Sequence, residues 1–544
     1  MSIDKINRDD EAAQSKDLLQ DNIDKLKTLF PEVVTEGRID FNVLRDILGD
    51  EVETEEEYYR FTWAGKSQAR REAHKPTRGT LRPAREESVN FDDTENLYLE
   101  GDNLEVLKLL QKSYPGNVKM IYIDPPYNTG KDFVYKDDYK DNLGNYKKLT
   151  GQVDEEGNDF ATNSDSDGRY HSNWLNMMYP RLILARNCLS NEGIIQISIA
   201  DEEVANLRKL CDEIFGENNF IAEIIRNTNS SKNQSLFVSV SHEYCLIYAK
   251  NINDLKEKHK DKKWGVPKNN IEAYQKKVKE LKAEGLIDKE IEKELKTLTK
   301  YPRFIDFMNY WYFDERGLYR KGDLGGVKNG NMTPIMNPLT GTKDPVPPGG
   351  FRYESEKIEQ LIKCNRIHFH EDGSLPTIKR YLHENPYQRP KSITSDDQRP
   401  DFSLMKEFNT PFDNPKQLEF MKRYLSISDK DAIILDFFAG SSTTAHAVMK
   451  LNSEDGGERK YIMVQIPESL QKDSEAYKVG YKNLSELAKT RIKRAGKKIR
   501  EVKHSEINDK EAALRKLQNK GELFKADQEE VKTLEAQIEE LKKI

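Results

Sequence analysis

The sequence of 544 residues is poor in cysteine and has no long apolar run, and both absences limit what it can be. Its four cysteines lie far apart with no C-x-x-C pair, which argues against a disulfide scaffold and against a zinc site. No stretch approaches the roughly 18 apolar residues of a membrane span, and the opening MSIDKINRDD has no apolar core like that of a signal peptide. We therefore expect a cytoplasmic protein with no membrane segment and no metal.

An excess of positive charge is also missing. The net charge is −7, so any case for nucleic-acid binding must rest on local patches rather than on the whole chain. The pattern G-x-G-x-x-G is absent, and WAGKS at 63–67 has the tail of a P-loop but has Arg60 where the first glycine belongs. No convincing nuclease motif is present either.

Strand and helix patterns alternate in two parts of the chain, which predicts an α/β fold with a parallel sheet. The first part starts near Asn96 and the second near Asp431, so one sheet is interrupted and then resumed. A Lys/Glu-rich tract and an aromatic, Gly/Pro-rich stretch lie between them. The predicted segments are a helical N-terminal region and connector (1–94), a first α/β half (95–250), an insert (251–400), a second α/β half (401–503) and a helical dimerisation or docking segment (504–544).

The stretch KMIYIDPPYNTG, residues 119–130, places an acid, two prolines and a tyrosine directly after an apolar strand. In open α/β sheets, ligands bind beyond the carboxyl ends of the strands. A plain turn would tolerate Asp and Pro but would not require this order. The pattern favours transfer to a planar amino group. The two N–H groups of that amino group would donate hydrogen bonds to the Asp124 carboxylate and to the Pro125 carbonyl. Pro126 would hold this geometry rigid while Tyr127 stacks on the ring.

A second stretch, LDFFAGSSTTAHAV at 435–448, has the properties of a cofactor loop. Its small residues, Ala439, Gly440, Ser441 and Ser442, let the backbone approach a ligand closely. The helix that begins near Thr443 directs its N-terminal dipole toward that ligand, which favours an anionic group. The next strand ends at Glu468, an acid suited to the ribose hydroxyls of a nucleoside cofactor. A tight strand-to-helix turn without a ligand is the alternative.

These two stretches resemble the catalytic and S-adenosylmethionine-binding motifs of amino-group DNA methyltransferases. Their order, with the catalytic motif first and an insert before the cofactor motif, is similar to the beta class. The wider context, including RFTWAGK, TENLYLEGDNLEVLKLL and SHEYCLIYAK, looks like the modification subunit of a Type III restriction-modification system, over roughly 58–250 and 400–500. The resemblance implies a Rossmann-like methyltransferase sheet, circularly permuted, with an inserted target-recognition domain and helical N- and C-terminal extensions.

Site residues follow from the resemblance by motif. It implies that Asp124, Pro125, Pro126 and Tyr127 form the catalytic motif that holds a target adenine. The implied cofactor pocket consists of Asp102, Asp124, Asp436, Phe438, Ala439, Gly440, Ser441 and Glu468. Within it, Asp102 of GDN would face the cofactor's adenine, and Asp124 would also meet the methionine amino group. The usual motif has a second glycine where this chain has Ser442, so the close approach depends on Gly440.

The insert is expected to read the DNA sequence, with lysines neutralising phosphates and other groups facing the groove or stacking. The candidates are Tyr310, Trp311, Arg316, Tyr319, Arg320 and Lys321. The basic segment RIKRAGKKIR is a second phosphate candidate, through Arg491, Lys493 and Arg494. A Lys/Glu-rich helix is equally often a solvated face, and that alternative stays open.

The resulting expectation is a site-specific enzyme that transfers a methyl group from S-adenosylmethionine to adenine N6 of a base flipped out of duplex DNA. The aspartate that opens the catalytic motif favours adenine N6 over cytosine N4. The resemblance also implies a homodimer that joins a helicase-nuclease restriction subunit. Alternatives are a cytosine N4 methyltransferase, or an enzyme that methylates RNA or protein amino groups through a related motif.

Overall fold

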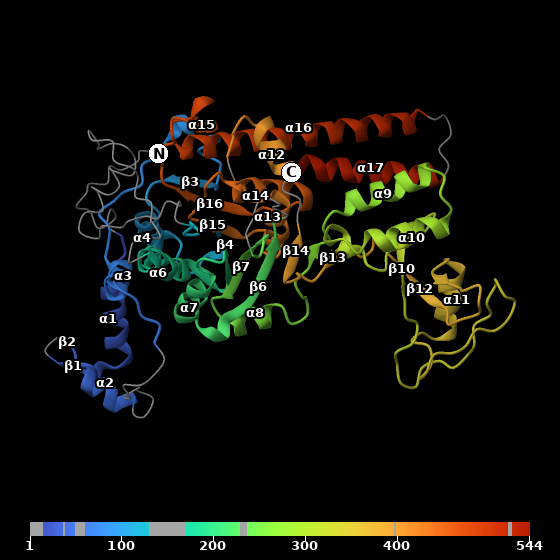
Figure 1. Ribbon diagram of the computed structural model, residues 1–544, viewed down its shortest axis with the longest axis horizontal. Coiled ribbons are helices and arrows are strands. Elements are labelled where there is room, and N and C mark those ends of the chain that lie inside the picture. The colour runs from blue at the N-terminus through green and yellow to red at the C-terminus, as the bar shows by residue number, and fades with distance from the viewer. Residues whose placement is uncertain are drawn as a thin grey trace. The chain divides into compact units, whose positions relative to one another are not determined.

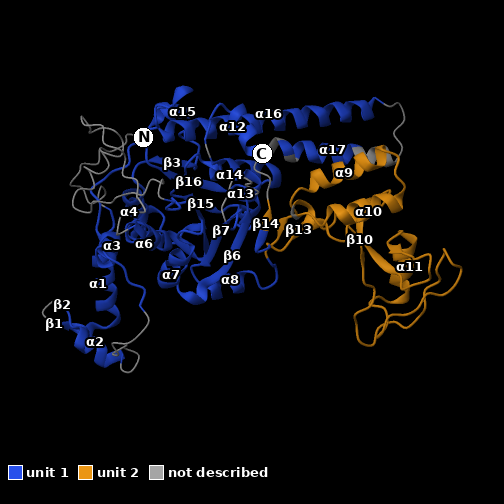
Figure 2. Cartoon of the chain, in the orientation of Figure 1, with its two compact units in different colours: residues 1–263, 391–393, 397–544 blue, residues 264–390, 394–396 orange. Residues whose placement is uncertain are grey.

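The computed structural model describes residues 15–35, 38–48, 60–129, 170–228, 237–395, 399–412, 414–519 and 525–543. The chain divides into two compact units (Figure 2). The first unit comprises 1–263, 391–393 and 397–544, and the second comprises 264–390 and 394–396. The second unit therefore lies inside the segment 251–400 that the sequence marks as an insert.

An eight-stranded mixed sheet forms the centre of the first unit, in the order β14-β6-β7-β5-β4-β15-β16-β3 (Figure 1). In chain order its strands are Leu97–Glu100 (β3), Val118–Ile123 (β4), Leu189–Ile199 (β5), Phe220–Asn227 (β6), His242–Ala249 (β7), Ile393–Ser395 (β14), Ile433–Asp436 (β15) and Lys460–Gln465 (β16). The five strands from β5 to β3 pair in parallel. The predicted α/β class is confirmed.

One part of the sheet departs from the prediction. β7 pairs antiparallel with both β5 and β6, whereas the alternation of strands and helices predicted parallel pairing. β6 was not predicted from the sequence: its residues are mostly half-buried, and only Ile224 and Arg226 are fully buried. Antiparallel neighbours need no crossover helix, so the rule that links helices to parallel strands does not apply here.

The two halves of the chain interleave within the sheet. β15, from the second half, lies between β4 and β16, and β3 from the first half lies beyond β16 at the edge. The pairing of Met120 with Ile434 and of Leu97 with Ile462 fixes the register on either side. The predicted resumption of one sheet after the insert is thus confirmed.

Helices cover the sheet, which explains why its central strands are apolar on both faces. α4 (Asn103–Ser113), α6 (Tyr170–Cys188) and α7 (Val204–Phe215) pack side by side on one face, and α13 (Leu418–Leu425), α14 (Thr443–Asp455) and α16 (Leu484–Gln518) form the other group (Figure 1). Ile121, Trp174 and Leu207 are fully buried in the resulting core. The shorter helices of this unit are α8 (Ile252–Lys258), α12 (Arg399–Glu407) and α15 (Glu475–Lys478).

Both ends of the chain carry helical extensions, as predicted. The N-terminal elements are α1 (Leu18–Leu29), β1 (Val34–Thr35), β2 (Arg38–Ile39), α2 (Phe41–Leu48) and α3 (Lys66–His74). At the other end, α16 runs unbroken through the predicted boundary between 503 and 504, and α17 (Lys525–Lys543) packs against it. Among the described residues, every helix is too short or too polar to cross a membrane.

The second unit has its own sheet and cores. Its antiparallel sheet has the order β11-β12-β10-β9, and a two-stranded sheet pairs β13 with β8. The strands are Val266–Pro267 (β8), Tyr312–Asp314 (β9), Gly317–Gly322 (β10), Ile367–His368 (β11), Thr377–Tyr381 (β12) and Tyr387–Gln388 (β13). The helices are α9 (Ile271–Ala283), α10 (Asp288–Leu298) and α11 (Ser355–Lys363). The Lys/Glu tract thus forms α9 and α10, which bury an apolar stripe that includes Tyr274 and Leu295.

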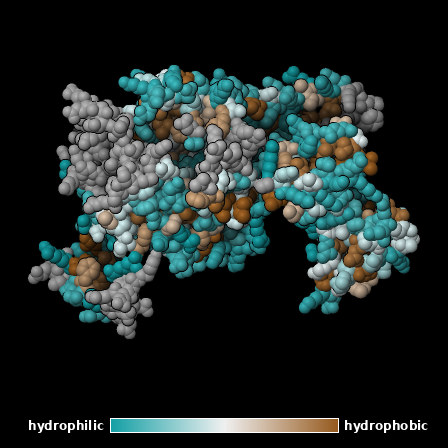
Figure 3. All heavy atoms as spheres, in the orientation of Figure 1, coloured by the Kyte–Doolittle hydropathy of each residue, from teal (hydrophilic) through white to brown (hydrophobic). Residues whose placement is uncertain are grey.

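The described surface in Figure 3 is mainly hydrophilic, with apolar residues in small separate patches. Charged residues make up 33% of the chain, and most of those that the structure describes are exposed or half-buried. A buried charged side chain is therefore unusual in the described part of the chain. Lys108 of α4 and Glu72 of α3 form such a pair, with Nζ to Oε1 at 2.7 Å and side chains 4% and 3% exposed.

We predict that Lys108→Met destabilises the first unit by about 3 kcal/mol, because it leaves the buried Glu72 carboxylate without its shielded partner. Urea unfolding followed by circular dichroism measures this loss. The matched control is Arg85→Met, which breaks the exposed Arg85–Asp92 pair and should cost about 0 to 1 kcal/mol. Equal losses in the two variants would show that the buried pair has no special weight.

Candidate active site

The predicted site residues gather at one edge of the sheet because the strands that carry them are parallel neighbours. Asp102 follows β3, Glu468 follows β16, Asp436 ends β15 and Asp124 follows β4. These four strands are adjacent and run in the same direction, so their carboxyl ends meet at one edge. The structure therefore brings together acids that lie far apart in the sequence.

Asp436 organises the loop that the sequence marks as a cofactor loop. Its Oδ1 accepts the Phe438 N–H at 3.1 Å, and its Oδ2 accepts the Thr444 hydroxyl at 2.5 Å. Burial raises the pKa of this carboxyl to about 7, against the lowering effect of both hydrogen bonds, and the charge of Asp124 adds to the rise. Asp436 therefore holds both ends of the turn from β15 into α14.

The small residues of this loop adopt conformations that favour glycine. Gly440 has φ +51°, and its N–H donates to Gln465 Oε1 at 2.7 Å. Ser442, at the position where a second glycine was expected, has φ +62° and caps α14 without a side-chain hydrogen bond. Its buried hydroxyl has no hydrogen-bond partner among the described residues. The turn therefore keeps a left-handed backbone at Ser442 despite the missing glycine.

Arg491 lies beneath the same loop. It is fully buried, and its Nη1 donates to Ser441 Oγ and to Thr443 Oγ1, both at 2.7 Å. Its Nε and Nη2 have no hydrogen-bond partner in the described part of the chain, and burial lowers the pKa of its guanidinium to about 10. The predicted phosphate contact through Arg491 is wrong, because the side chain does not reach the surface. Its charge instead adds to the positive N-terminus of α14.

The start of α4 is tied to the same loop by Arg181. This fully buried arginine donates through Nε to Asn103 Oδ1 at 2.6 Å, and its Nη2 lies 3.6 Å from Asp102 Oδ2. Asn103 in turn donates to the Phe437 carbonyl at 2.7 Å. Asp102 also caps α4 by accepting the Glu105 N–H. Its position at this edge therefore depends on a buried network as well as on β3.

Glu468 follows β16, between the strands that carry Asp436 and Asp102. Burial raises the pKa of its carboxyl to about 7. Its backbone N–H donates to the Ile466 carbonyl at 2.7 Å, which turns the chain directly after β16. A shielded acid next to a glycine loop suits a ligand that brings its own hydroxyl donors. The residues present thus fit a nucleoside cofactor.

The acid-proline-proline-tyrosine motif meets a lysine from the second half of the chain. Lys416 Nζ lies 3.1 Å from Asp124 Oδ1 as an ion pair and donates to Glu243 Oε2 at 2.9 Å. It also donates to the Tyr127 hydroxyl and lies 4.8 Å from the centre of the Tyr127 ring. The lysine side chain is only 10% exposed. One ammonium therefore contacts both polar side chains of the motif.

Two cations share Glu243 of β7. Arg226 Nη2 donates to its Oε2 at 2.7 Å, and the Tyr127 hydroxyl donates to the same oxygen at 3.2 Å. Burial raises the pKa of Glu243, but Lys416 and then Arg226 outweigh it and hold the pKa at about 2. Burial, together with the Asp124 and Glu243 charges, raises the pKa of Tyr127 well above its usual range. Glu243 is therefore charged at neutral pH and Tyr127 is a neutral phenol.

The backbone of the motif is held from behind. The Trp174 indole N–H donates to the Pro126 carbonyl at 2.7 Å. Asn128, the residue after the motif, has φ +64° and is fully buried, and its amide donates to Glu203 at 2.6 Å. The Pro126 carbonyl is already engaged, and the motif predicts that a substrate amino group donates to the Pro125 carbonyl instead. The arrangement can hold a flat amino-bearing ring against Tyr127 and accept its protons at Asp124.

The predicted DNA contacts are only partly exposed. Tyr310 and Tyr319 are 3% and 5% exposed, and the Tyr319 hydroxyl bonds to His368, so the prediction that these two rings stack on DNA is wrong. Trp311 donates to Thr299, Arg320 lies beside the Tyr310 ring, and Lys321 lies 4.0 Å from the Tyr312 ring. Arg494 donates to the Phe408 carbonyl, and Arg316, Lys493 and Arg494 are all exposed. For these six residues, DNA contact stays a prediction.

Several residues of the site were missed by the sequence analysis. Lys416, Glu243 and Arg226 carry the charges around Tyr127, and Gln465 and Thr444 hold the cofactor loop. Two weak signals were present: an arginine inside an apolar strand, and a glutamine at the end of another. Both residue types are rarely buried unless they are paired. Lys416 lies in an irregular segment and has no such signal.

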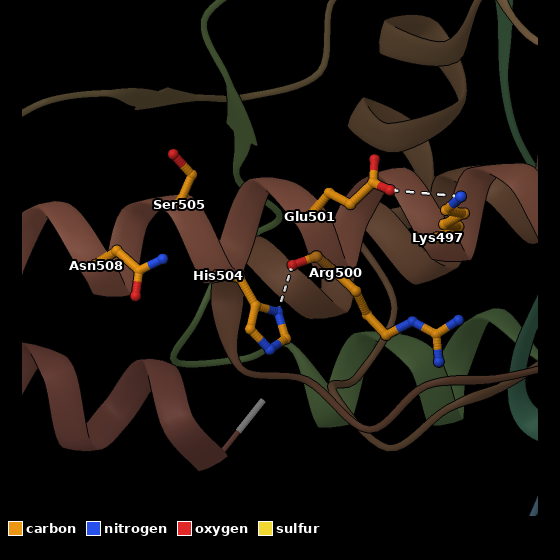
Figure 4. Close-up of a pocket in the computed structure, with 6 residues that line it drawn as sticks. All are labelled: Lys497, Arg500, Glu501, His504, Ser505 and Asn508. Carbon is orange, nitrogen blue, oxygen red and sulfur yellow. Dashed lines mark hydrogen bonds and ion pairs between the residues drawn. The ribbon is translucent and has the colours of Figure 1, made fainter.

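A separate surface depression lies on α16 (Figure 4). It is lined by Lys497, Arg500, Glu501, His504, Ser505 and Asn508. The side chains interact mainly within the helix, as in the pair of His504 with the Arg500 carbonyl. These residues follow the buried start of α16, and none of them belongs to the strand ends or loops that carry the site. The depression is therefore not part of the candidate active site.

Comparisons with known proteins found a matching family and several relatives. A family model described as DNA methylase matches residues 118–502. The EcoP15I Type III restriction-modification Mod subunit of Escherichia coli is 33% identical over 512 residues, which cover 90% of this chain and 77% of that protein. The StyLTI Mod subunit of Salmonella typhimurium is 34% identical, over 81% of this chain and 63% of that protein.

A Type II relative and the solved structures are more distant. Methyltransferase M.KpnI of Klebsiella pneumoniae is 30% identical over 77% of this chain and 91% of its own length. Among solved structures, a putative DNA modification methylase from Thermus thermophilus, complexed with S-adenosylmethionine, has a TM-score of 0.30 and 13% identity. That comparison covers 74% of this chain and 94% of the other.

We predict that Ser442→Gly stabilises the protein by about 1 kcal/mol, because glycine relieves the left-handed strain and removes a buried hydroxyl without a partner. Ser441→Gly is the matched control. It should destabilise the protein by about 1 kcal/mol, because it removes the hydroxyl that binds Arg491. Urea midpoints of the two variants test this pair, and a loss of stability in Ser442→Gly would contradict it.

Proposed function

Because the chain belongs to the DNA methylase family, we propose that it transfers a methyl group from S-adenosylmethionine to adenine N6 in duplex DNA. Its similarity to the Mod subunits supports a role as the modification and specificity subunit of a Type III restriction-modification system. The observation that carries the proposal is the juxtaposition of Asp124 and Tyr127 with the loop of Asp436 and Gly440 at one edge of the sheet.

The residues divide the work between two adjoining sites. On the cofactor side, Glu468 accepts the ribose hydroxyls, Asp102 faces the adenine ring, and Gly440 lets the backbone approach. Arg491 and the start of α14 add positive potential that favours the cofactor's carboxylate. The bound cofactor supplies an electrophilic methyl group. These assignments rest on the position of each residue at the carboxyl edge and on the shielded, unusually basic acids found there.

On the substrate side, adenine leaves the base stack and lies against Tyr127. The Asp124 carboxylate and the Pro125 carbonyl accept its two N6–H bonds, which increases the electron density on nitrogen. The nitrogen lone pair forms the new bond to carbon, and the pair of the broken carbon–sulfur bond stays on sulfur. Asp124 then takes the surplus proton from N6. No covalent bond to the protein is formed in this sequence.

Partners follow from the same proposal. The second unit is the candidate for sequence recognition, because it is compact and lies between the two halves of the sheet in the sequence. The helices α16 and α17 are candidates for dimerisation or for docking a restriction subunit, because they extend beyond the buried start of α16. Bacterial DNA lies in the cytoplasm, which is where we propose that the protein works.

We predict that DNA from bacteria that express the wild type carries N6-methyladenine at one short motif, and that Asp124→Ala abolishes the mark. Single-molecule sequencing of total DNA measures both. Lys422→Met is a useful companion and should keep the mark, because Lys422 pairs with Glu419 and Glu454 and contacts no residue of the catalytic motif that the structure describes. Cytosine N4 marks in place of methyladenine would contradict the target base, and no mark on duplex DNA would contradict the proposed function.

A second prediction concerns pH. The carboxyl of Glu468, with its pKa near 7, is protonated below neutrality and then accepts hydroxyl hydrogen bonds poorly. Affinity for S-adenosylhomocysteine should therefore rise about five- to tenfold from pH 6 to pH 8, because charged acceptors bind hydroxyls more strongly. Asp436 titrates in the same range, so the variant Glu468→Gln should lose only that part of the pH dependence that Glu468 contributes. Titration calorimetry at each pH measures the affinity. An equal dependence of affinity on pH in the wild type and in Glu468→Gln would show that Glu468 is not the cause.

A further inference from the structure

The lysine between the two halves of the active site has no role in the transfer described above. Lys416 belongs to the irregular segment directly before α13, whose first residue is Leu418. The Leu418 N–H donates to Asp401 at 2.8 Å, and α13 buries Phe420, Met421 and Leu425. The base of the lysine side chain is therefore fixed, and its ammonium reaches a defined point beside Asp124.

The two oxygens of the Asp124 carboxylate have different surroundings, because only one of them lies beside the ammonium. Oδ1 is buried and lies 3.1 Å from Lys416 Nζ, although the two are not aligned as a hydrogen bond. The Asp124 side chain as a whole is 27% exposed, so its exposed part lies on the Oδ2 side. The carboxylate thus presents a single oxygen to a substrate. The same ammonium contacts the Tyr127 hydroxyl and thereby fixes the ring on which a base would stack.

Charge balance at this point supports a fixed arrangement. The two carboxylates of Asp124 and Glu243 face the two cations of Lys416 and Arg226. Without the lysine, two negative side chains would share one guanidinium, and Asp124 would lose the only cation that an ion pair gives it among the described residues. A shielded ion pair of this kind is costly to break, because one charge is left without compensation.

We propose that Lys416 is the positioning residue of the methyl transfer. It fixes the rotamers of Asp124 and Tyr127, so that one carboxylate oxygen and one ring face are in place before the target base binds. This inference rests on the proposed function and adds a residue to it. Lys416 acts through Asp124 and Tyr127 and takes no part in the bonds that form or break. Because misplacement by about 1 Å can cost a hundredfold in rate, its removal affects turnover more than binding.

The test compares Lys416→Met with Lys422→Met in steady-state methylation of duplex DNA that contains the recognised site. Lys422 is a matched control, because it is 13% exposed and pairs with Glu419 and Glu454 away from the motif. We expect Lys416→Met to lower kcat about a hundredfold with KM for DNA within threefold of the wild type, and Lys422→Met to keep both. Lys416→Arg should regain at least a tenth of the lost activity, since it restores the positive charge.

A second readout separates positioning from folding. The first measurement is the fluorescence of 2-aminopurine at the target position: Lys416→Met should still flip the base, but Tyr127 should quench its fluorescence less than in the wild type. The second is the affinity for S-adenosylhomocysteine, which should stay unchanged. Wild-type turnover in Lys416→Met, or equal losses in the two methionine variants, would overturn the positioning role while leaving the proposed function intact. No methylation by the wild type and by Lys422→Met alike would overturn the proposed function, and this inference with it.

Discussion

Parallel pairing of β4 with β15 is the contact on which the site depends. It places Met120 beside Ile434 and Ile121 beside Leu435, so that strands from the two halves of the chain end at the same edge. Both strands are apolar and buried, and removal of their side chains from water drives the pairing. The catalytic motif and the cofactor loop then lie close enough for the charge of Asp124 to influence Asp436.

Acids at this edge fall into two groups whose surroundings differ. Asp436 and Glu468 lie where burial dominates, and the pKa of each rises to about 7. Glu243 is also buried, but two cations hold its pKa at about 2. Carboxyl groups are thus kept partly neutral on the cofactor side, whereas the Glu243 carboxylate beside the substrate motif is fully charged. Partners, rather than depth alone, separate the two groups.

Buried arginines have a common role in this fold. Arg181 links the start of α4 to the loop after β15, Arg491 supports that loop from α16, and Arg226 holds Glu243. A guanidinium can do this because it offers several donors in a fixed plane. This structural role of buried arginines also explains why a basic stretch in the sequence was a poor guide to DNA contact. In RIKRAGKKIR the helix turns Arg491 inward and leaves Lys493 exposed.

The sequence alone determined the α/β class, the order of the two motifs and the acids at their strand ends, because these depend on local patterns: apolar runs, turn residues and a strand followed by an acid. Only the tertiary structure decided the antiparallel β6–β7 pair, the left-handed backbone at Ser442 and the lysine beside Asp124. Lys416 and Asp124 share no local pattern, since α13 and β4 are brought together by packing and not by sequence. The inward or outward direction of Tyr310, Tyr319 and Arg491 was likewise set by the cores against which they pack.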